Sequence, residues 1–195
     1  MASTASPYGL RAVNELGGLP YAGSTRTFLI DPAGTTGSIF NGTVVGIDSN
    51  GYIKAVDTTG EDGSTNALNA VGVFVGCSYV NAQGQQIWSQ YYPTGVTGVI
   101  SATVIDDDRT VFQVQAAGVI SQNELGKNVY FSSASQTGST TTGNSNNAVV
   151  AVSVATAAAF KIVGFASGPG DAYTDVLVKF NPGQHVYNTA TYTAV

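Results

Sequence analysis

Gly42-Thr43-Val44-Val45 begins a phrase that ends, after a polar interval, at Val71-Gly72-Val73-Phe74-Val75-Gly76. The chain repeats this phrase, because Gly126-Lys127-Asn128-Val129-Tyr130 leads, after a second polar interval, to Ile162-Val163-Gly164-Phe165-Ala166-Ser167-Gly168. Each copy joins a glycine-led strand to a run of small and β-branched residues, and such runs are typical of β-strands. Internal similarity on this scale indicates repeated supersecondary units, so the doubled phrase predicts two related β-modules.

Turn signals between the apolar runs predict hairpins. Ser49-Asn50-Gly51 offers the left-handed backbone positions of a tight turn. A second turn is expected at Ala82-Gln83-Gly84, and a third at Asp106-Asp107-Asp108-Arg109, between apolar runs at 99–105 and 110–115. We therefore expect the last two runs to pair with each other as a hairpin.

The remaining pattern is that of strands and loops. Apolar residues alternate at 149–154 and 176–180, which predicts two further strands, whereas the polar stretches 57–69 and 132–147 predict exposed loops. No window of useful length repeats its apolar residues every 3.6 positions. The fold class is therefore all-β, with short antiparallel strands in a barrel or sandwich.

The N-terminal region differs from the rest of the chain. Residues 1–30 carry glycine, proline and scattered apolar anchors without a clean period, so we expect an extended N-terminal arm rather than a packed element. Residues 31–195 then form a β-rich body. The doubled phrase leaves open whether this body is one unit or two halves, residues 31–98 and 99–195.

The chain carries little charge. Charged residues make up 10% of the 195 residues, and the net charge is −5, whereas an average soluble domain contains about 25% charged residues. Because no basic field is available to attract phosphates, we expect no direct nucleic-acid partner. The sequence also shows no apolar stretch of about 18 residues and no signal-peptide pattern, so we expect no membrane association and synthesis in a cytoplasm.

Residues that normally do chemistry are scarce. Cys77 is the only cysteine and follows an apolar run, which predicts a buried side chain rather than a reactive thiol. The aspartates of 106–108 lack the ligand spacing of a calcium loop. His185 is the only histidine, no G-x-S-x-G motif accompanies it, and we expect it at the surface or an interface. We therefore expect no enzyme activity, no catalytic residue, no metal and no cofactor.

One aromatic group is a candidate binding surface. Trp88, Tyr91 and Tyr92 lie close together, and such rings stack on sugars or anchor partner proteins. The alternative is a cluster of core residues. Because strand alternation puts Trp88 and Tyr91 on opposite faces, at least one ring should remain near the surface.

Three longer phrases lie in the arm, at the centre and near the end of the chain: Tyr8-Gly9-Leu10-Arg11-Ala12-Val13-Asn14-Glu15-Leu16-Gly17-Gly18 with Pro20-Tyr21-Ala22-Gly23-Ser24-Thr25-Arg26, Gly72-Val73-Phe74-Val75-Gly76-Cys77-Ser78-Tyr79, and Asp171-Ala172-Tyr173-Thr174-Asp175-Val176-Leu177-Val178-Lys179-Phe180-Asn181. Together they make up 37 of the 195 residues and resemble structural proteins of tailed bacteriophages, above all capsid decoration (cement) proteins. The resemblance implies a non-enzymatic virion protein on the capsid exterior. Such a protein binds the outside of an icosahedral head, often as a homotrimer, and holds neighbouring major capsid protein subunits together.

On this interpretation the arm supplies the contacts with the shell. It contains unpaired apolar anchors and two of the seven basic residues, and the expected partner-binding residues are Tyr8, Leu10, Arg11, Tyr21, Arg26 and Phe28. An alternative function is a head-fibre or tail accessory module that binds host surface glycans through residues 88–92 or 132–147. A small hydrolase is disfavoured, because the chain has a single histidine, a single cysteine and no recognisable pair of catalytic acids.

Overall fold

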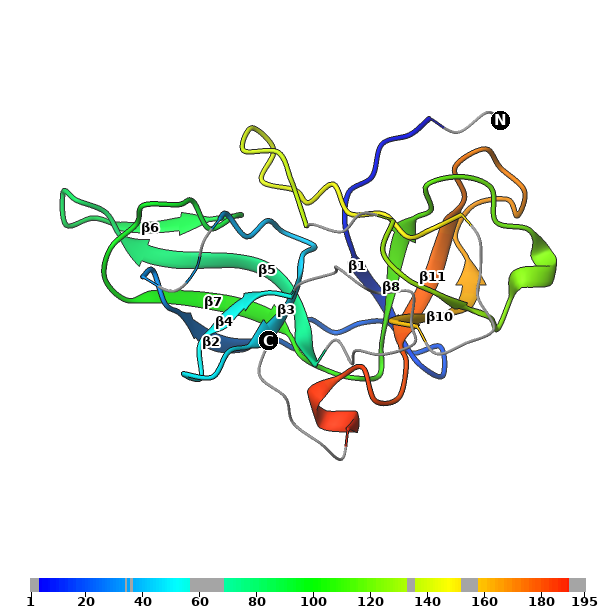
Figure 1. Ribbon diagram of the computed structural model, residues 1–195, viewed down its shortest axis with the longest axis horizontal. Helices are drawn as coiled ribbons and strands as arrows, with labels where there is room; N and C mark the ends of the chain where they lie inside the picture. Colours follow the sequence, from blue (N-terminus) through cyan, green and yellow to red (C-terminus); the bar gives the residue numbers. More distant parts are fainter. Residues whose placement is uncertain are drawn as a thin grey trace.

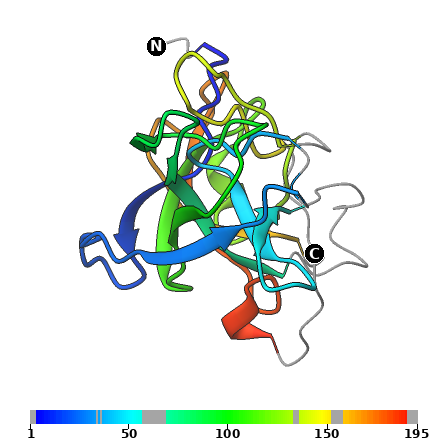
Figure 2. The ribbon, with the colours of Figure 1, turned by 90° about the vertical axis from the view of Figure 1, so that its left-hand side faces the viewer.

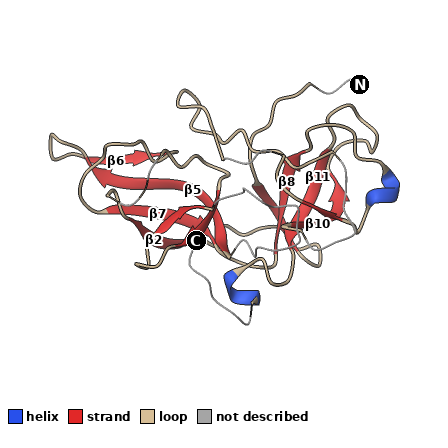
Figure 3. Cartoon of the chain, in the orientation of Figure 1, coloured by secondary structure: helices blue, strands red, loops and turns tan. Residues whose placement is uncertain are grey.

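A computed structural model describes residues 4–33, 35, 37–56, 69–132, 136–151 and 158–189. Two antiparallel sheets pack in a sandwich-like arrangement, and neither sheet closes into a barrel (Figure 1). Apart from two single-turn 3-10 helices, the described residues form strands and loops (Figure 3). The all-β prediction is confirmed, and of its two alternatives the sandwich is the one observed.

The first sheet holds the strands from β2 to β7, in the order β2-β7-β5-β3-β4, with β6 paired to the C-terminal half of β5. Their bounds are Arg26–Ile30 (β2), Val44–Ile47 (β3), Ile53–Ala55 (β4), Ala70–Val80 (β5), Gln86–Ser89 (β6) and Ile100–Ile105 (β7).

The second sheet has the order β1-β8-β11-β10-β9. Its strands are Arg11–Glu15 (β1), Thr110–Gln115 (β8), Asn128–Val129 (β9), Phe160–Phe165 (β10) and Asp175–Phe180 (β11). The 3-10 helix η1 (Gln122–Glu124) precedes β9, and η2 (Val186–Asn188) follows β11 and lies at the lower edge of the molecule, drawn in red in Figures 1 and 2.

The two copies of the sequence phrase occupy equivalent places. β3 pairs with β5, and β9 pairs with β10. In the first sheet β2 lies beside β7, followed by β5 and β3, and in the second β8 lies beside β11, followed by β10 and β9. Each set of four strands therefore has its first strand beside its fourth, which is a Greek-key order. Both copies also shift register at a glycine, against β7 at Gly76 and against β11 at Gly164.

Two clusters of buried side chains hold these strands together. The first-sheet core lies on one face of the first sheet and consists of Ile30, Ile39, Val45, Ile53, Val71, Phe74, Cys77, Tyr92, Ile100, Ala102 and Val104. The shared core joins the two sheets and includes Val44, Val73 and Ile105 of the first sheet with the rings of Phe112, Phe160 and Phe180. Phe160 and Phe180 have ring centroids 5.2 Å apart. Burying each such side chain contributes about 1.5–3 kcal/mol.

Two predicted hairpins are confirmed. β3 and β4 pair antiparallel, and the turn between them is held by the Asp48 carboxylate, whose Oδ1 accepts the backbone N–H groups of Asn50 (2.8 Å) and Tyr52 (2.9 Å). β5 and β6 pair across the turn that contains Gly84. The predicted strand at 176–180 is also present, as β11.

The third predicted hairpin is wrong. The strands lie where the sequence places them, but β7 pairs with β2 and β5, whereas β8 pairs with β1 and β11. The aspartate turn at 106–109 therefore carries the chain from one sheet to the other. Both neighbours of each strand are already occupied, so no edge remains for β7 and β8 to share.

The expected free arm is also wrong. β1 is paired with β8, β2 is paired with β7, and the Leu10 side chain is buried in the shared core. The apolar residues of 1–30 show no clear period because this region supplies only one short strand to each sheet, with a loop between the two strands. The partners of both strands lie 70 or more residues further along the chain.

The polar stretch 132–147 is more than an exposed loop. The Gln136 side chain donates to the carbonyls of Val44 (2.7 Å) and Val56 (2.9 Å) and accepts the Val44 N–H (2.8 Å). A glutamine amide reproduces the donor and acceptor of a peptide group, so it continues the hydrogen bonding of β3 and β4. Ser145 and Asn147 are buried accordingly. The predictions for 57–68 and 152–157 lie outside the described residues, and Val149 forms only isolated bridges, to Ala116 and Phe131.

We predict that Gly72→Ala destabilises the protein by about 3 kcal/mol or more, as overpacking a close-packed interior does. A Cβ atom at Gly72 would lie 2.0 Å from the Ile105 carbonyl oxygen, a backbone atom that cannot move aside on its own. Gly168→Ala is the matched control, because its nearest atoms belong to the Asp171 carboxylate at 3.4 Å or more. Chemical denaturation of both variants measures the difference, and equal stabilities would contradict the close approach of β5 and β7.

Candidate functional site

The residues predicted to bind a partner differ in how exposed their side chains are. Leu10 is buried and Phe28 packs against the first-sheet core, so neither presents an anchor to another molecule. Tyr8 and Tyr21 are half-buried, and only Arg11 and Arg26 are exposed. Of these six residues, the two cations are therefore the ones that are exposed.

Tyr8 and Arg11 form one unit at the edge of the second sheet. The Tyr8 hydroxyl donates to Asp175 Oδ1 at 2.9 Å, and the Arg11 guanidinium carbon lies 4.5 Å from the Tyr8 ring centroid. Burial, and then the hydrogen bond to the Asp175 carboxylate, raise the pKa of Tyr8 well above its ordinary value. The neutral ring therefore supports the guanidinium by stacking, a geometry that suits arginine.

The aromatic group at 88–92 is also divided. Trp88 is 78% exposed, whereas Tyr92 is buried in the first-sheet core. Tyr91 is half-buried and stacks on Phe40, with ring centroids 5.5 Å apart. The expectation that one ring remains near the surface is confirmed for Trp88, and the predicted surface role of Tyr92 is wrong because its ring packs in the first-sheet core, next to an isolated bridge with Ile39.

Trp88 belongs to an uncovered part of the first sheet. The second sheet covers one face of β5 at its N-terminal half, where Val73 and Val75 meet the shared core, but not at its C-terminal half. There Trp88 pairs with Ser78, Ser78 with Ser101, and Ser101 with Leu29, so these four residues form one row across β6, β5, β7 and β2. We call this surface the outer face; it consists of the buried Ser78 and, around it, Thr27, Leu29, Val80, Gln86, Trp88, Val99, Ser101 and Thr103.

The outer face is apolar at its rim and uncharged throughout. Leu29, Val80 and Val99 are exposed together with Trp88, and the hydroxyl side chains between them are small. The sequence predicted only Trp88. Alternation along each strand shows which side of the strand Leu29, Val80 and Val99 occupy. Whether the three residues lie together depends on the order of the strands in the sheet. Exposed apolar residues that gather on one face mark an interaction site more often than scattered ones do.

A second polar group joins three distant segments, and we call it the C-terminal clasp: Arg26, Asp106, Asp108, His185, Tyr187 and Asn188. Arg26 Nε lies 2.9 Å from Asp106 Oδ2, and its Nη1 donates to the Tyr187 hydroxyl at 2.9 Å. Asn188 Nδ2 donates to Asp108 Oδ2 at 2.7 Å. The clasp holds η2 against the start of β2 and the turn between the sheets. It therefore occupies Arg26, the second of the exposed arm residues.

The predicted surface position of His185 is wrong. The His185 ring is fully buried between Phe180 and Tyr187, with ring centroids 5.4 and 5.2 Å away. Its Nδ1 accepts the Tyr187 backbone N–H at 3.3 Å and caps η2. Burial lowers the pKa of His185 below its ordinary 6.5, and Asp108, Asp106 and Asp107 partly offset this effect. Because Nδ1 is an acceptor here, protonation would remove the cap.

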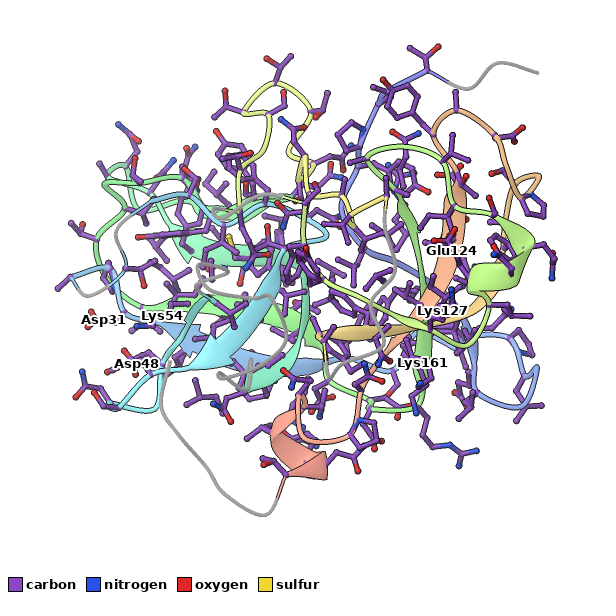
Figure 4. All side chains as sticks on the ribbon, turned by 45° about the vertical axis from the view of Figure 1, so that its right-hand side comes forward. Asp31, Asp48, Lys54, Glu124, Lys127 and Lys161 are labelled. Carbon is purple, nitrogen blue, oxygen red and sulfur yellow. The ribbon has the colours of Figure 1, made fainter. Side chains whose placement is uncertain are left out.

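One further prediction about chemistry, that of a buried Cys77, is tested by the described residues. Cys77 is buried, and burial raises the pKa of its thiol to about 12, so the expectation of an unreactive side chain is confirmed. Within the described ranges, no three His, Cys, Asp or Glu side chains lie close enough to hold a metal ion. Figure 4 labels six charged side chains: Asp31, Asp48 and Lys54 lie after β2, after β3 and in β4, and Glu124, Lys127 and Lys161 lie in η1, before β9 and in β10.

Two adjoining hollows lie where the covered and uncovered parts of β5 meet. The larger is a cleft of about 440 Å³ between the sheets, and the smaller is about 300 Å³ and lies beside Trp88. Val75 and Gln90 line both hollows. Arg11 is the only residue of Asp, Glu, Lys, Arg or His type that lines either of them.

We predict that the protein loses stability as the pH falls below about 6.5. Since the folded pKa of His185 is depressed, the unfolded chain binds the proton more readily, and the stability present above pH 6.5 declines by up to about 1.4 kcal/mol per pH unit. His185→Asn keeps a side-chain cap and does not titrate. Denaturation at pH 7.5, 6.5 and 5.5 should show a flatter profile for the variant, and parallel profiles would disprove the role of His185.

Comparison with known proteins adds no relative. No protein-family model, no curated protein and no solved structure matches the chain. No helix among the described residues is long and apolar enough to span a membrane. The function is therefore argued from the outer face, the adjoining hollows and the C-terminal clasp.

Proposed function

We propose that this protein is a non-enzymatic virion protein that binds the outer surface of an icosahedral phage head and stabilises contacts between major capsid protein subunits. The observation that carries the proposal is the outer face, an uncharged β-surface with Trp88 exposed at one end of its central row and Leu29 at the other. The resemblance of the chain to capsid decoration proteins names the partner.

The chemistry of the outer face suits a protein partner. Tryptophan is enriched among the residues that dominate binding energy at protein interfaces, and charged residues are depleted at interface cores. A face without charge brings little desolvation cost when it is covered. Because this face carries no charge, the protein can place it against a partner without repulsion between like charges, although the chain as a whole is acidic.

The outer face of one copy is smaller than a standard interface, which favours binding by several copies at once. Four strands about 4.8 Å apart, each contributing about five residues at about 3.3 Å, make a flat face of roughly 300 Å². A standard interface needs about 800 Å² from each partner. Several copies, held as a homotrimer on a shell that repeats its subunits, would gain affinity through multivalency that one copy lacks.

Glycan binding is a second candidate, and the exposed Trp88 ring is the observation that favours it. The other exposed apolar residues of the outer face are the aliphatic Leu29, Val80 and Val99. Aliphatic side chains offer sugars neither a stacking surface nor a hydrogen bond, whereas they pack well against protein. The protein partner is therefore the better supported of the two.

We predict that Trp88→Ala weakens attachment to purified heads that lack this protein. Removing an aromatic side chain that dominates the binding energy of an interface costs about 2 kcal/mol, which corresponds to roughly thirtyfold weaker binding. Leu125→Ala is the matched control, because Leu125 is an exposed apolar residue of the second sheet region, outside the outer face. Sedimentation of heads with increasing protein, followed by quantification of bound copies, measures the affinity.

Three outcomes would count against the proposal. Wild-type protein that does not bind the heads would reject the function, and equal binding by Trp88→Ala would reject the outer face as the contact. A glycan array that retains the wild-type protein and loses Trp88→Ala would favour the second candidate.

A further inference from the structure

We propose that β6 pairs edge to edge with β6 of a second copy of this chain, in antiparallel orientation, about a twofold axis beside Ile87. The inference goes beyond the proposed function, because it concerns a contact between copies and needs no shell. A twofold contact is compatible with the proposed homotrimer, since an icosahedral shell has both twofold and threefold axes.

The free edge of β6 is the surface in question. Among the described residues β6 pairs with β5 and with no other strand, and it lies at the margin of the first sheet (Figure 1). A strand with one neighbour presents a row of unpaired N–H and C=O groups, and another chain can add a strand there.

The hydrogen bonds of the β5–β6 hairpin show which backbone groups face this edge. The Asn81 N–H donates to the Gln85 carbonyl at 2.9 Å. In an antiparallel pair, every second residue directs its backbone groups to the same neighbour. The odd-numbered residues of β6 therefore face β5, whereas Gln86 and Trp88 direct their backbone groups outward. No described residue makes a hydrogen bond with these outward groups.

The edge of β6 also lacks the features that normally prevent such pairing. Natural edge strands are protected by charged side chains, proline, bulges or a covering segment. The four other described strands with a single neighbour, β1, β2, β4 and β9, each have a charged residue in the strand or directly beside it. β6 and its flanking residues Gln85 and Gln90 have none. Two copies, each with net charge −5, can therefore meet at this edge without direct repulsion.

The spacing of the outward groups favours a second copy as the occupant, because it is self-complementary. When Ile87 lies opposite Ile87 of the second copy, Gln86 of each copy lies opposite Trp88 of the other. Each of these two pairs then exchanges two hydrogen bonds, and the Ile87 pair between them has its Cα atoms about 4.5 Å apart. Every outward N–H and C=O of Gln86 and Trp88 is satisfied. Isologous twofold contacts of this kind are the commonest in homo-oligomers.

The twofold contact enlarges the outer face without covering it. A twofold axis perpendicular to the sheet keeps the outer faces of both copies on the same side, with Gln86 of one copy beside Trp88 of the other. One copy offers roughly 300 Å², so the pair offers about 600 Å², which approaches the roughly 800 Å² of a standard interface.

Disulfide formation tests the register. Ile87→Cys places two thiols at the closest pair, within the Cα separation of about 4.4–6.8 Å that a disulfide needs. Ser89→Cys is the matched control, because its two copies would lie about 13 Å apart along the strands. Both variants carry Cys77→Ala, since Cys77 pairs with Ser89 within the chain. With glutathione disulfide as the oxidant, we expect a covalent dimer from Ile87→Cys on a non-reducing gel and at least tenfold less from Ser89→Cys.

Sedimentation equilibrium tests the contact without a covalent link. Gln86→Pro removes an outward N–H, and proline is tolerated where an edge strand directs its N–H away from the sheet, so the hairpin with β5 is kept. Gln86→Ala is the matched control, because it removes the side chain and keeps the N–H. We expect wild type and Gln86→Ala to associate in pairs as their concentration rises, and Gln86→Pro to associate at least tenfold more weakly.

Several results would overturn the inference. They are the lack of a covalent dimer from Ile87→Cys, equal cross-linking by Ser89→Cys, and undiminished association of Gln86→Pro. If wild type stays unpaired in solution while Gln86→Pro alone loses binding to heads, the edge receives a strand of the shell protein, and the second copy is rejected. Thermal unfolding midpoints equal to those of the parent proteins show that the variants are folded, and the disulfide test does not depend on Gln86→Pro.

Binding to heads separates this inference from the proposed function. If the protein binds heads but Ile87→Cys gives no covalent dimer, either free or bound, the inference fails and the function stands. If Ile87→Cys gives the covalent dimer in solution and the protein does not bind heads, the function fails and the contact between copies stands.

Discussion

The structure depends on the burial of β5 on both of its faces. Val71 and Phe74 enter the first-sheet core, while Ala70 and Val73 enter the shared core, so one strand joins the packing of both sheets. A strand with two buried faces needs apolar or very small residues at successive positions, and the run at 70–77 meets this requirement. At Gly72 the backbone of β7 approaches so closely that no side chain fits.

The same strand explains where the binding surfaces lie. β5 extends beyond the second sheet, so the face that is covered at Val73 is open to solvent near Val80. The outer face is the uncovered continuation of the face that builds the shared core. The larger of the two hollows lies where the covered part of this face ends and the outer face begins. The position of the outer face and the packing of the two sheets therefore both follow from the difference in length between β5 and the second sheet that packs on it.

Local patterns predicted strands well and pairings poorly. The runs at 99–105 and 110–115 are strands, yet they belong to different sheets, because pairing is decided by which edges remain available. Leu10 and His185 are buried by partners far along the chain, and a residue's own neighbours carry no sign of such partners. Gln136 lies in a stretch without apolar residues, and only its hydrogen bonds to β3 and β4 show that this stretch supports the sheet.

The sequence by itself determined the all-β class, the turns at Gly51 and Gly84, the low charge and the doubled phrase, because each depends on residues close together in the chain. The tertiary structure decided which strands are neighbours, and hence that Trp88, Leu29, Val80 and Val99 share one face while Tyr92 and Leu10 do not. The physical reason is that alternation assigns a side chain to one side of its own strand, whereas strand order assigns that side to core or to solvent.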